Sequence, residues 1–307
     1  MAEPKILRIY LDPSSLDHAR DGAFGIVSRV TAAFEGQGFR VELRKNSESE
    51  MRKSATRNGY SLFLMDDPFH AKALTLRRAY YYPFWRIEAS AKRWEFEVAQ
   101  QRFDPAKIDP IKAENWANRW RKWIFKAKTL DGVTRNGPVY IPLQGRLLER
   151  RSFQTHSPVN MIRATQDQVG DKPILLGLHP GEAYSPEELS AVQGIADADP
   201  RIMLQTGGMD QALRVCDHIV TENSAAALSG FFFHKPAVLF GQIDFHHQMA
   251  NVSELGLNRA FSEMKKRTPA FDKYLYWFIQ MNAIKADIDS AESAILDRVR
   301  RHGWQVD

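Results

Sequence analysis

The sequence predicts an α/β fold with two Rossmann-like parallel-sheet domains facing a cleft. Residues 5–65 alternate strand patterns with helix patterns, and residues 139–240 do so again. A segment rich in turn residues lies between these two stretches. Alternation of this kind is typical of a doubly wound parallel sheet, because each parallel crossover carries a helix. A chain of 307 residues has room for two such domains.

Three strands are expected in the first half. Their sequences are KILRIYL at residues 5–11, FRVEL at residues 39–43 and YSLFLM at residues 60–65. Apolar residues at helical spacing predict a helix between the first two strands, and they are Phe24, Val27, Val30 and Phe34. The pair Ser47 and Glu50 resembles a capping box that opens a short polar helix.

Aromatic and basic residues dominate residues 77–125, where five of the seven tryptophans lie. A helix is expected near residues 110–125, and Trp116, Trp120 and Trp123 share one of its faces. Such a stripe predicts packed core or a domain contact. Within YYYPFWRIE, Arg86 and Glu88 beside exposed aromatics are a candidate contact for a sugar or a lipid-linked acceptor.

Further strands and helices alternate in the second half. Strands are expected at residues 139–143, 172–178, 201–205, 217–220 and 237–240, and helices at residues 157–169 and 185–196. We expect a domain boundary in TLDGVTRNGP, residues 129–138. The predicted divisions are a first domain at 1–137, a second domain at 138–267 and helices at 268–307. Thr268 is the expected cap of the first tail helix, with Pro269 at its first position.

Composition is that of a soluble globular protein, with 44% hydrophobic and 26% charged residues. The start of the chain lacks the basic-then-apolar layout of a signal peptide, and no apolar run approaches about 18 residues, so a cytoplasmic location is expected. The single cysteine, Cys216, has no partner for a disulfide or a zinc site and is expected to be a small buried residue.

Positive charge concentrates in the first half. Residues 1–137 hold 25 Lys and Arg against 17 Asp and Glu, a balance of +8, within a net charge of +5. A basic face suits an anionic acceptor, the anionic inner leaflet of a membrane or nucleic acid, and a solvated helix surface explains it equally well. No nucleic-acid motif is recognisable, so no nucleic-acid partner is expected.

Two carboxylates, Asp66 and Asp67, follow directly after the third strand. Ligands of open parallel sheets bind beyond the carboxyl ends of the strands, which is where this pair falls. One of them is a candidate general base that takes the proton of an acceptor hydroxyl. The alternative is a structural turn or helix cap formed by D-D-P.

Three loops after strands of the second half carry polar groups, and they share one edge of the expected sheet. The candidate ligand-binding residues in them are Gln144 and Arg146 in the first loop, His179, Pro180 and Gly181 in the second, and Thr221, Glu222, Asn223, Ser224 and Ala225 in the third. No G-x-G-x-x-G follows the first strand, so no dinucleotide cofactor is expected.

The third loop opens the stretch TENSAAALSGFFFHKPAVLFG, residues 221–241. Thr221 or Asn223 is expected to cap a helix that Lys235 closes and Pro236 stops before a buried strand. The start of a helix carries unpaired N–H groups and attracts anions, above all phosphate, although an ordinary capped helix has the same sequence pattern.

This stretch resembles the C-terminal signature of the bacterial capsular polysaccharide synthesis proteins, which include Kdo transferases. The family usually has T-x-N-S followed by G-K-P-V. This chain departs from it at His234, where Gly is usual, and at Ala225 and Ala226. His179–Pro180 also resembles the family's H-P motif, and Pro142–Gln144 its P-L-Q motif. Gly177 stands where a Lys is frequent, and the expected acidic residue is displaced to Glu149.

The resemblance implies a GT-B glycosyltransferase with a nucleotide-activated sugar donor, CMP-Kdo being one candidate, and a glycan or lipid-linked acceptor. It implies that 1–137 is the acceptor-side domain and 138–267 the nucleotide-sugar domain. It implies that His179, Asn223 and Ser224 hold the donor phosphate without a metal, and that Gln144 and Arg146 contact the donor or a sugar carboxylate. A catalytic role falls on His179 and on Asp66 or Asp67. In GT-B enzymes the last helices commonly cross back to the first domain.

Other interpretations stay open. The chain is alternatively a non-catalytic relative that binds a nucleotide or polysaccharide in an export or assembly complex, which the departures from the family pattern permit. Peripheral contact with the inner membrane is compatible with the basic first half. His246 and His247 are adjacent on an expected extended chain and point to opposite sides, so no metal site is predicted.

Overall fold

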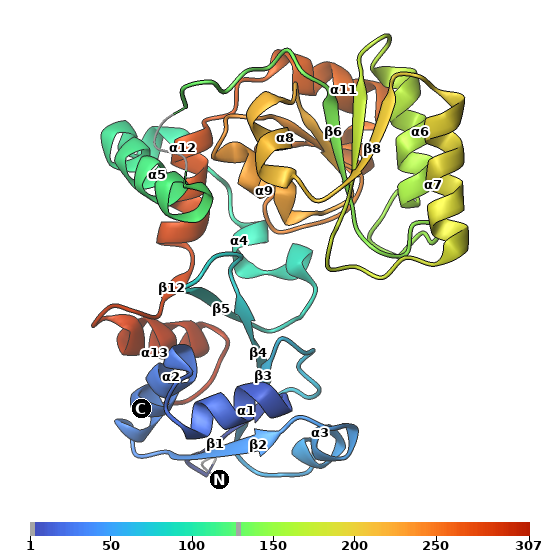
Figure 1. Cartoon of the computed structure of the whole chain (residues 1–307). Helices are drawn as coiled ribbons and strands as arrows, with labels where there is room; N and C mark the ends of the chain where they lie inside the picture. The colour runs from blue at the N-terminus through green and yellow to red at the C-terminus, as the bar shows by residue number, and fades with distance from the viewer. Residues whose placement is uncertain (1–3, 127–129) are drawn as a thin grey trace. The chain divides into compact units, whose positions relative to one another are not determined.

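The computed structural model describes residues 4–126 and 130–307. The chain forms two compact units, and both are α/β (Figure 1). The first unit consists of residues Met1–Gln101 and Phe278–Asp307, and the second of Arg102–Trp277. These units divide at residues 101 and 277, whereas the sequence places boundaries at 137 and 267. Thr129, in the expected boundary segment, lies outside the described residues.

The first unit is built on a six-stranded sheet of order β12-β5-β4-β3-β1-β2. Its strands are β1 (Ile6–Leu11), β2 (Arg40–Lys45), β3 (Tyr60–Leu64), β4 (Ala73–Arg78), β5 (Phe84–Glu88) and β12 (Ile284–Lys285). The first four are parallel, and β5 and β12 are antiparallel to their neighbours. The three strands expected in this half are present. The antiparallel pair β4–β5 was not predicted from the sequence.

The described part of this unit has five α-helices, and the first, second and last of them contribute to a continuous apolar core. They are α1 (Pro13–Arg20), α2 (Gly25–Glu35), α3 (Glu48–Ser54), α4 (Glu97–Gln100) and α13 (Ala291–Arg301), with a 3-10 turn at Arg93–Glu95. The residues of α2 expected on one face, from Val27 to Phe34, are buried. The C-terminal α13 packs against α2, and Arg29 Nη1 bonds Glu292 Oε1 at 2.7 Å.

The second unit holds a fully parallel sheet of order β11-β10-β9-β6-β7-β8. Its strands are β6 (Val139–Leu143), β7 (Ile174–Leu178), β8 (Ile202–Thr206), β9 (Ile219–Thr221), β10 (Ala237–Leu239) and β11 (Ala250–Asn251). If these six strands are numbered 1 to 6 along the chain, their order in the sheet is 6-5-4-1-2-3, which is the Rossmann topology. The alternation predicted from residue 139 onward is therefore confirmed.

Nine helical segments accompany this sheet in the described part of the unit, and α6 and α7 lie side by side (Figure 1). They are a 3-10 turn at Pro105–Lys107, α5 (Pro110–Phe125), α6 (Pro158–Gln168), α7 (Pro186–Ala198), α8 (Met209–Val215), α9 (Ala225–Phe231), α10 (Val252–Leu255), α11 (Leu257–Lys266) and α12 (Phe271–Leu275). A π-helix spans Tyr276–Met281. On α5, Trp116 is buried against Phe232, as expected of a packing face, whereas Trp123 is 53% exposed.

Arg86 and Glu88 are buried structural residues and not an exposed acceptor contact. They lie in β5 with exposed fractions of 0% and 1%. The Arg86 guanidinium donates to the backbone oxygens of Phe278 and Asn282. The Arg86 guanidinium therefore fixes the backbone at and just after the π-helix. The interpretation of Arg86 and Glu88 as an acceptor contact is wrong.

Lys235 does not close the helix α9, which ends at Phe231. Its side chain is fully buried, and its ammonium donates to the backbone oxygens of Thr134, Arg214 and Cys216. Cys216 is buried, as expected of a lone cysteine. One carbonyl from the segment before β6 and two from the end of α8 thus meet at one buried cation, which ties together the edge of the sheet where the strands begin.

Two further expectations fail in the C-terminal part of the second unit. Thr268 and Pro269 do not start a helix, because α12 begins at Phe271 with Ala270 as its cap residue. The rings of His246 and His247 do not point to opposite sides but stack with their centroids 4.3 Å apart. The chain there forms a turn, so the alternation of an extended strand does not apply.

No helix in the described residues is long and apolar enough to span a bilayer.

Candidate functional site

The candidate loops of the second unit meet at the point where the strand order of its sheet reverses. From β6 the chain proceeds outward through β7 and β8, then returns to β9 on the other side of β6. In an open parallel sheet, the loops at the carboxyl ends of the two strands beside this switch point form the ligand crevice. Here those two strands are β6 and β9, and β7 is the other neighbour of β6. All three predicted loops therefore lie along one edge.

The loop after β6 begins with Gln144, which is half-buried, and Arg146, which is exposed. Arg146 has a left-handed backbone, φ 64°, and forms an exposed ion pair with Glu149 at 3.5 Å. Gly145, which lies between Gln144 and Arg146, is close to the loop after β7, since a Cβ on it would stand 2.7 Å from Glu182 Oε2. The β6 and β7 loops are thus in contact.

Tyr184 joins the ends of β6 and β7. Its hydroxyl donates to the backbone oxygen of Leu143 at 3.1 Å and accepts from the amide of His179 at 2.8 Å. His179, Pro180 and Gly181 are exposed. The Gly181 amide donates to His179 Nδ1 at 3.1 Å. A neutral imidazole with an accepting Nδ1 carries its proton on Nε2, so His179 presents an N–H donor at the sheet edge.

The helix after β9, α9, is capped by a different residue from the two that the sequence predicts. Ser224, and neither Thr221 nor Asn223, is the N-cap of α9, and its hydroxyl accepts from the Ala226 amide at 3.2 Å. Thr221 is buried, and its hydroxyl accepts from the Ser224 amide. Two amides at the start of this seven-residue helix thus have partners within the loop. Asn223 is half-buried and Ala225 is exposed, so the loop reaches the surface of the unit.

Glu222 is the most unusual residue of this loop. It is 1% exposed, and its Oε1 has no hydrogen-bond partner in the described chain. Burial raises the pKa of its carboxyl to about 7, and the positive charge of Arg151 opposes that rise. A buried carboxyl that titrates near neutral pH is typical of functional sites.

Asp66 and Asp67 belong to the first unit. Both are exposed at the carboxyl end of β3, directly after Met65, whose backbone is left-handed with φ 63°. Asp66 accepts a hydrogen bond from the side chain of Asn46, and Asp67 Oδ1 accepts from the Ala91 amide at 3.1 Å. They lie beside β1, where the strand order of this sheet reverses.

Gly177 stands in β7 because the ring of Tyr140 on β6 fills the space beside it. A Cβ at Gly177 would lie 2.8 Å from Tyr140 Cε2 and 2.9 Å from the hydroxyl. Burial raises the pKa of Tyr140 to about 12, so its hydroxyl is neutral. The lysine that the sequence resemblance led us to expect at this position therefore has no room beside Tyr140.

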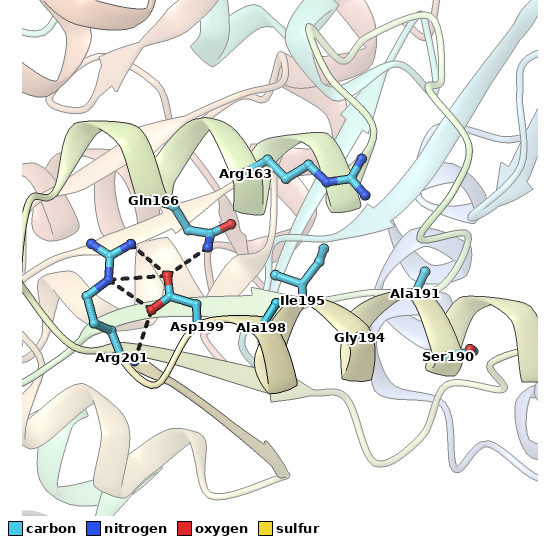
Figure 2. A pocket seen from close by; sticks show the side chains of 9 residues that line it. All are labelled: Arg163, Gln166, Ser190, Ala191, Gly194, Ile195, Ala198, Asp199 and Arg201. Atoms are coloured by element: carbon cyan, nitrogen blue, oxygen red, sulfur yellow. Dashed lines mark hydrogen bonds and ion pairs between the residues drawn. The ribbon is translucent and has the colours of Figure 1, made fainter.

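An open groove between α6 and α7 lies on the helical layer and contains none of the predicted residues (Figure 2). Its volume is about 570 Å³. Asp199 accepts hydrogen bonds from Arg201 and Gln166 at one end, and these bonds lower its pKa (Figure 2). The Arg163 side chain, on α6, points away from this cluster (Figure 2). The groove is therefore separate from the crevice at the strand ends.

Three residues of the β6 and β7 loops that bear on the site were not singled out from the sequence: Arg151, Gln154 and Tyr184. Arg151 and Gln154 lie in a long irregular loop, where sequence pattern gives no orientation. Tyr184 lies in the same loop as His179, five residues further on, and its closeness to the His179–Pro180 motif was the one sequence signal that pointed to it.

The chain has a GT-B-type fold, two α/β units each built on a Rossmann-like sheet. One similar solved structure is KpsC from Thermosulfurimonas dismutans, a β-Kdo 2,7 transferase. It has 13% identity over 96% of this chain and 99% of the other, with a TM-score of 0.56. At that identity the likeness defines the fold alone.

Two other similar structures have lower scores. S. aureus MnaA with UDP has 14% identity over 97% of this chain and 96% of the other, with a TM-score of 0.39. The UDP-GlcNAc 2-epimerase of Neisseria meningitidis, bound to UDP-GlcNAc, has 9% identity over 96% and 99%, with a TM-score of 0.36. Scores this low carry no argument about function. No protein-family model and no curated protein matches the sequence.

Proposed function

We propose that the chain is a glycosyltransferase of surface-polysaccharide synthesis that takes a sugar from a nucleotide-activated donor. CMP-Kdo is the first candidate donor, and a glycan or a lipid-linked sugar is the candidate acceptor. The observation that carries the proposal is the meeting of the β6, β7 and β9 loops at the switch point of a Rossmann sheet. The fold shared with a Kdo transferase supports it.

The donor phosphate would bind at the β7 and β9 loops. His179 offers its Nε2–H, because the Gly181 amide occupies Nδ1. On the β9 loop, Asn223 supplies a side-chain amide and Ser224 a hydroxyl. These neutral donors suit a phosphate oxygen, and an imidazole N–H in this place would stabilise the charge that grows on the leaving phosphate.

Transfer would proceed without a metal. His179 and the loop donors would then carry the stabilisation that a divalent cation supplies in other transferases.

Gln144 and Arg146 would contact the sugar end of the donor. Arg146 is exposed, and its partner Glu149 is also exposed, so the pair exchanges readily for a carboxylate on the sugar. Either Asp66 or Asp67 would act as general base on the acceptor hydroxyl. An exposed carboxylate that follows a strand at a switch point suits that role.

Donor hydrolysis tests the proposal. The full chain is incubated without acceptor with a panel of CMP-, UDP- and GDP-sugars, in EDTA, and nucleotide release is measured. We expect slow hydrolysis of one donor class, with CMP-Kdo the fastest, and its loss in His179→Ala. Binding of a nucleotide without turnover of any donor, even with acceptor glycans added, would favour the non-catalytic relative instead.

A further inference from the structure

A buried polar cluster of Arg151, Gln154 and Glu222 lies beside the candidate phosphate loops. Four of its side-chain atoms are buried and have no hydrogen-bond partner in the described chain: Arg151 Nε, Arg151 Nη2, Gln154 Nε2 and Glu222 Oε1. A buried polar group without a partner costs about 1–3 kcal/mol. Four of them in one place are unusual, since native proteins satisfy most buried polar groups.

The fold brings this cluster together from two sides of the switch point. The loop after β6 runs beside the end of β10, where Gln154 forms a bridge with Gly241 and the Gln242 amide donates to Phe153 O at 2.9 Å. Gly241 in turn lies on Glu222, since a Cβ there would be 3.0 Å from the Glu222 backbone oxygen. The donors of the cluster thus come from the β6 loop and its acceptor from the β9 loop.

Local contacts hold the side chains but leave these atoms unused. Gln154 Oε1 accepts a hydrogen bond from the Arg151 backbone amide at 2.7 Å. This bond fixes the Gln154 side chain through its oxygen and leaves Nε2 without a partner in the described chain. The Arg151 guanidinium lies over the Phe153 ring at 4.9 Å, a contact that is weak enough for the side chain to move. No ion pair joins Arg151 to Glu222 within the described residues, although the guanidinium is near enough to act on the carboxyl.

We propose that Arg151, Gln154 and Glu222 read the base of the bound nucleotide and favour cytosine over uracil. This inference rests on the proposed function, because it needs a nucleotide at the same switch point. Glu222 precedes Asn223 and Ser224, so a base bound at the cluster lies beside the proposed phosphate contacts. The Arg151 side chain, which is part-exposed, would swing from Phe153 to admit it.

Cytosine matches the separation of donors and acceptor. Its pairing edge has an amino group at one end and two acceptors, N3 and O2, beside it. The amino group would donate to Glu222, while Arg151 and Gln154 would donate to the two acceptors. Uracil has acceptors at both ends with an N–H between them, so its O4 would face the Glu222 carboxylate.

Calorimetry of the full chain with CMP and with UMP tests this assignment at pH 8, where Glu222 is ionised. The variants are Glu222→Gln, Gln154→Ala and, as a matched control, Glu187→Gln on the surface of α7. We expect the wild-type chain to bind CMP at least about tenfold more tightly than UMP, which corresponds to one charged hydrogen bond. Both cluster variants should bring the ratio of the two dissociation constants to within about threefold of unity, and the control should keep it.

A second readout separates base reading from a structural role. The preference for CMP should grow as pH rises from 6 to 8, because the ionised carboxylate accepts more strongly from the amino group and repels uracil O4, and Glu222→Gln should lose that dependence. An unchanged CMP-to-UMP ratio in folded Glu222→Gln and Gln154→Ala would overturn the inference alone. Failure of the wild-type chain to bind either nucleotide would overturn the proposed function together with it.

Discussion

The Gly181 amide donates a hydrogen bond to Nδ1 of His179 at 3.1 Å, and this bond fixes which imidazole nitrogen carries the proton. With Nδ1 accepting, the neutral ring holds its proton on Nε2. The His179 amide is held by the Tyr184 hydroxyl, which also binds the end of β6. The strand edge therefore positions a neutral N–H donor without help from a charged side chain.

Gly181→Ala should weaken nucleotide binding without unfolding the protein. A Cβ at Gly181 would lie 3.2 Å from His179 Cε1 and 3.4 Å from Nδ1, so the imidazole must shift. We expect a loss of CMP affinity of about five- to tenfold, the value of one hydrogen bond, measured by calorimetry. Gly194→Ala on α7 is the control, because nothing lies within 4 Å of the added carbon. Equal CMP affinities in the two variants would show that the His179–Gly181 hydrogen bond does not contribute to nucleotide binding.

Asp66→Asn and Asp67→Asn should separate transfer from donor binding. Each Asn keeps an oxygen that accepts from Asn46 or from the Ala91 amide, so the loop is preserved while the basic group is lost. We expect one of the two variants to lose transfer by about 10²- to 10⁴-fold, with CMP affinity unchanged. Full transfer activity in the double variant would reject both residues as the base.

Glu222 should make the stability of the protein fall as pH rises toward neutrality. Its pKa is about 7 in the folded chain against 4.5 for the free group, so between these values the folded chain binds more protons than the unfolded chain. The free energy of unfolding therefore decreases with pH across this window. Glu222→Gln removes the cost, and we expect it to stabilise the protein by up to about 3 kcal/mol at pH 8 and little at pH 4.5.

Urea denaturation of both proteins at the two pH values measures this difference. Glu187→Gln, a surface carboxyl of α7, should show no comparable gain at pH 8. A Glu222→Gln variant whose stability parallels that of the wild-type chain from pH 4.5 to 8 would mean that the carboxyl is not buried as described.

Lys235→Met should destabilise the second unit. The side chain fits the same buried space, but the backbone oxygens of Thr134, Arg214 and Cys216 lose their common donor. Removing one charged hydrogen-bonding partner from a buried site costs about 3 kcal/mol. Urea denaturation should show this loss, whereas Lys266→Met at an exposed position should change stability by less than about 0.5 kcal/mol. A loss no larger than the control's would contradict the structural role of Lys235.

Periodicity was sufficient to predict the central parallel strands of both sheets, but not the parallel strands β4 and β11. The buried runs that form β1, β3, β6 and β7 are short and continuous, and helical spacing marks α2 and α6 between them. The sheet edge that carries Gln144, His179 and Thr221 followed from the parallel order alone. These features depend on neighbours in sequence, which a pattern records.

Side-chain partners from distant segments were not predictable in this way. Lys235 looked like a charge at a helix end because its three carbonyl partners lie 19 to 101 residues away in sequence. Arg86 looked exposed because the carbonyls it binds belong to the chain near residue 280. The left-handed turn at His234, φ 53°, explains why glycine suits that position, and its ring stacks on Phe271 and bonds Asp272.

Calorimetric binding of CMP to the wild-type chain and to His179→Ala, both in EDTA, tests the central claim most directly. If the β6, β7 and β9 loops hold a nucleotide phosphate through the His179 N–H, the wild-type chain binds CMP and the variant loses at least about tenfold in affinity. Equal dissociation constants for the two proteins, or no binding by the wild-type chain, would contradict it.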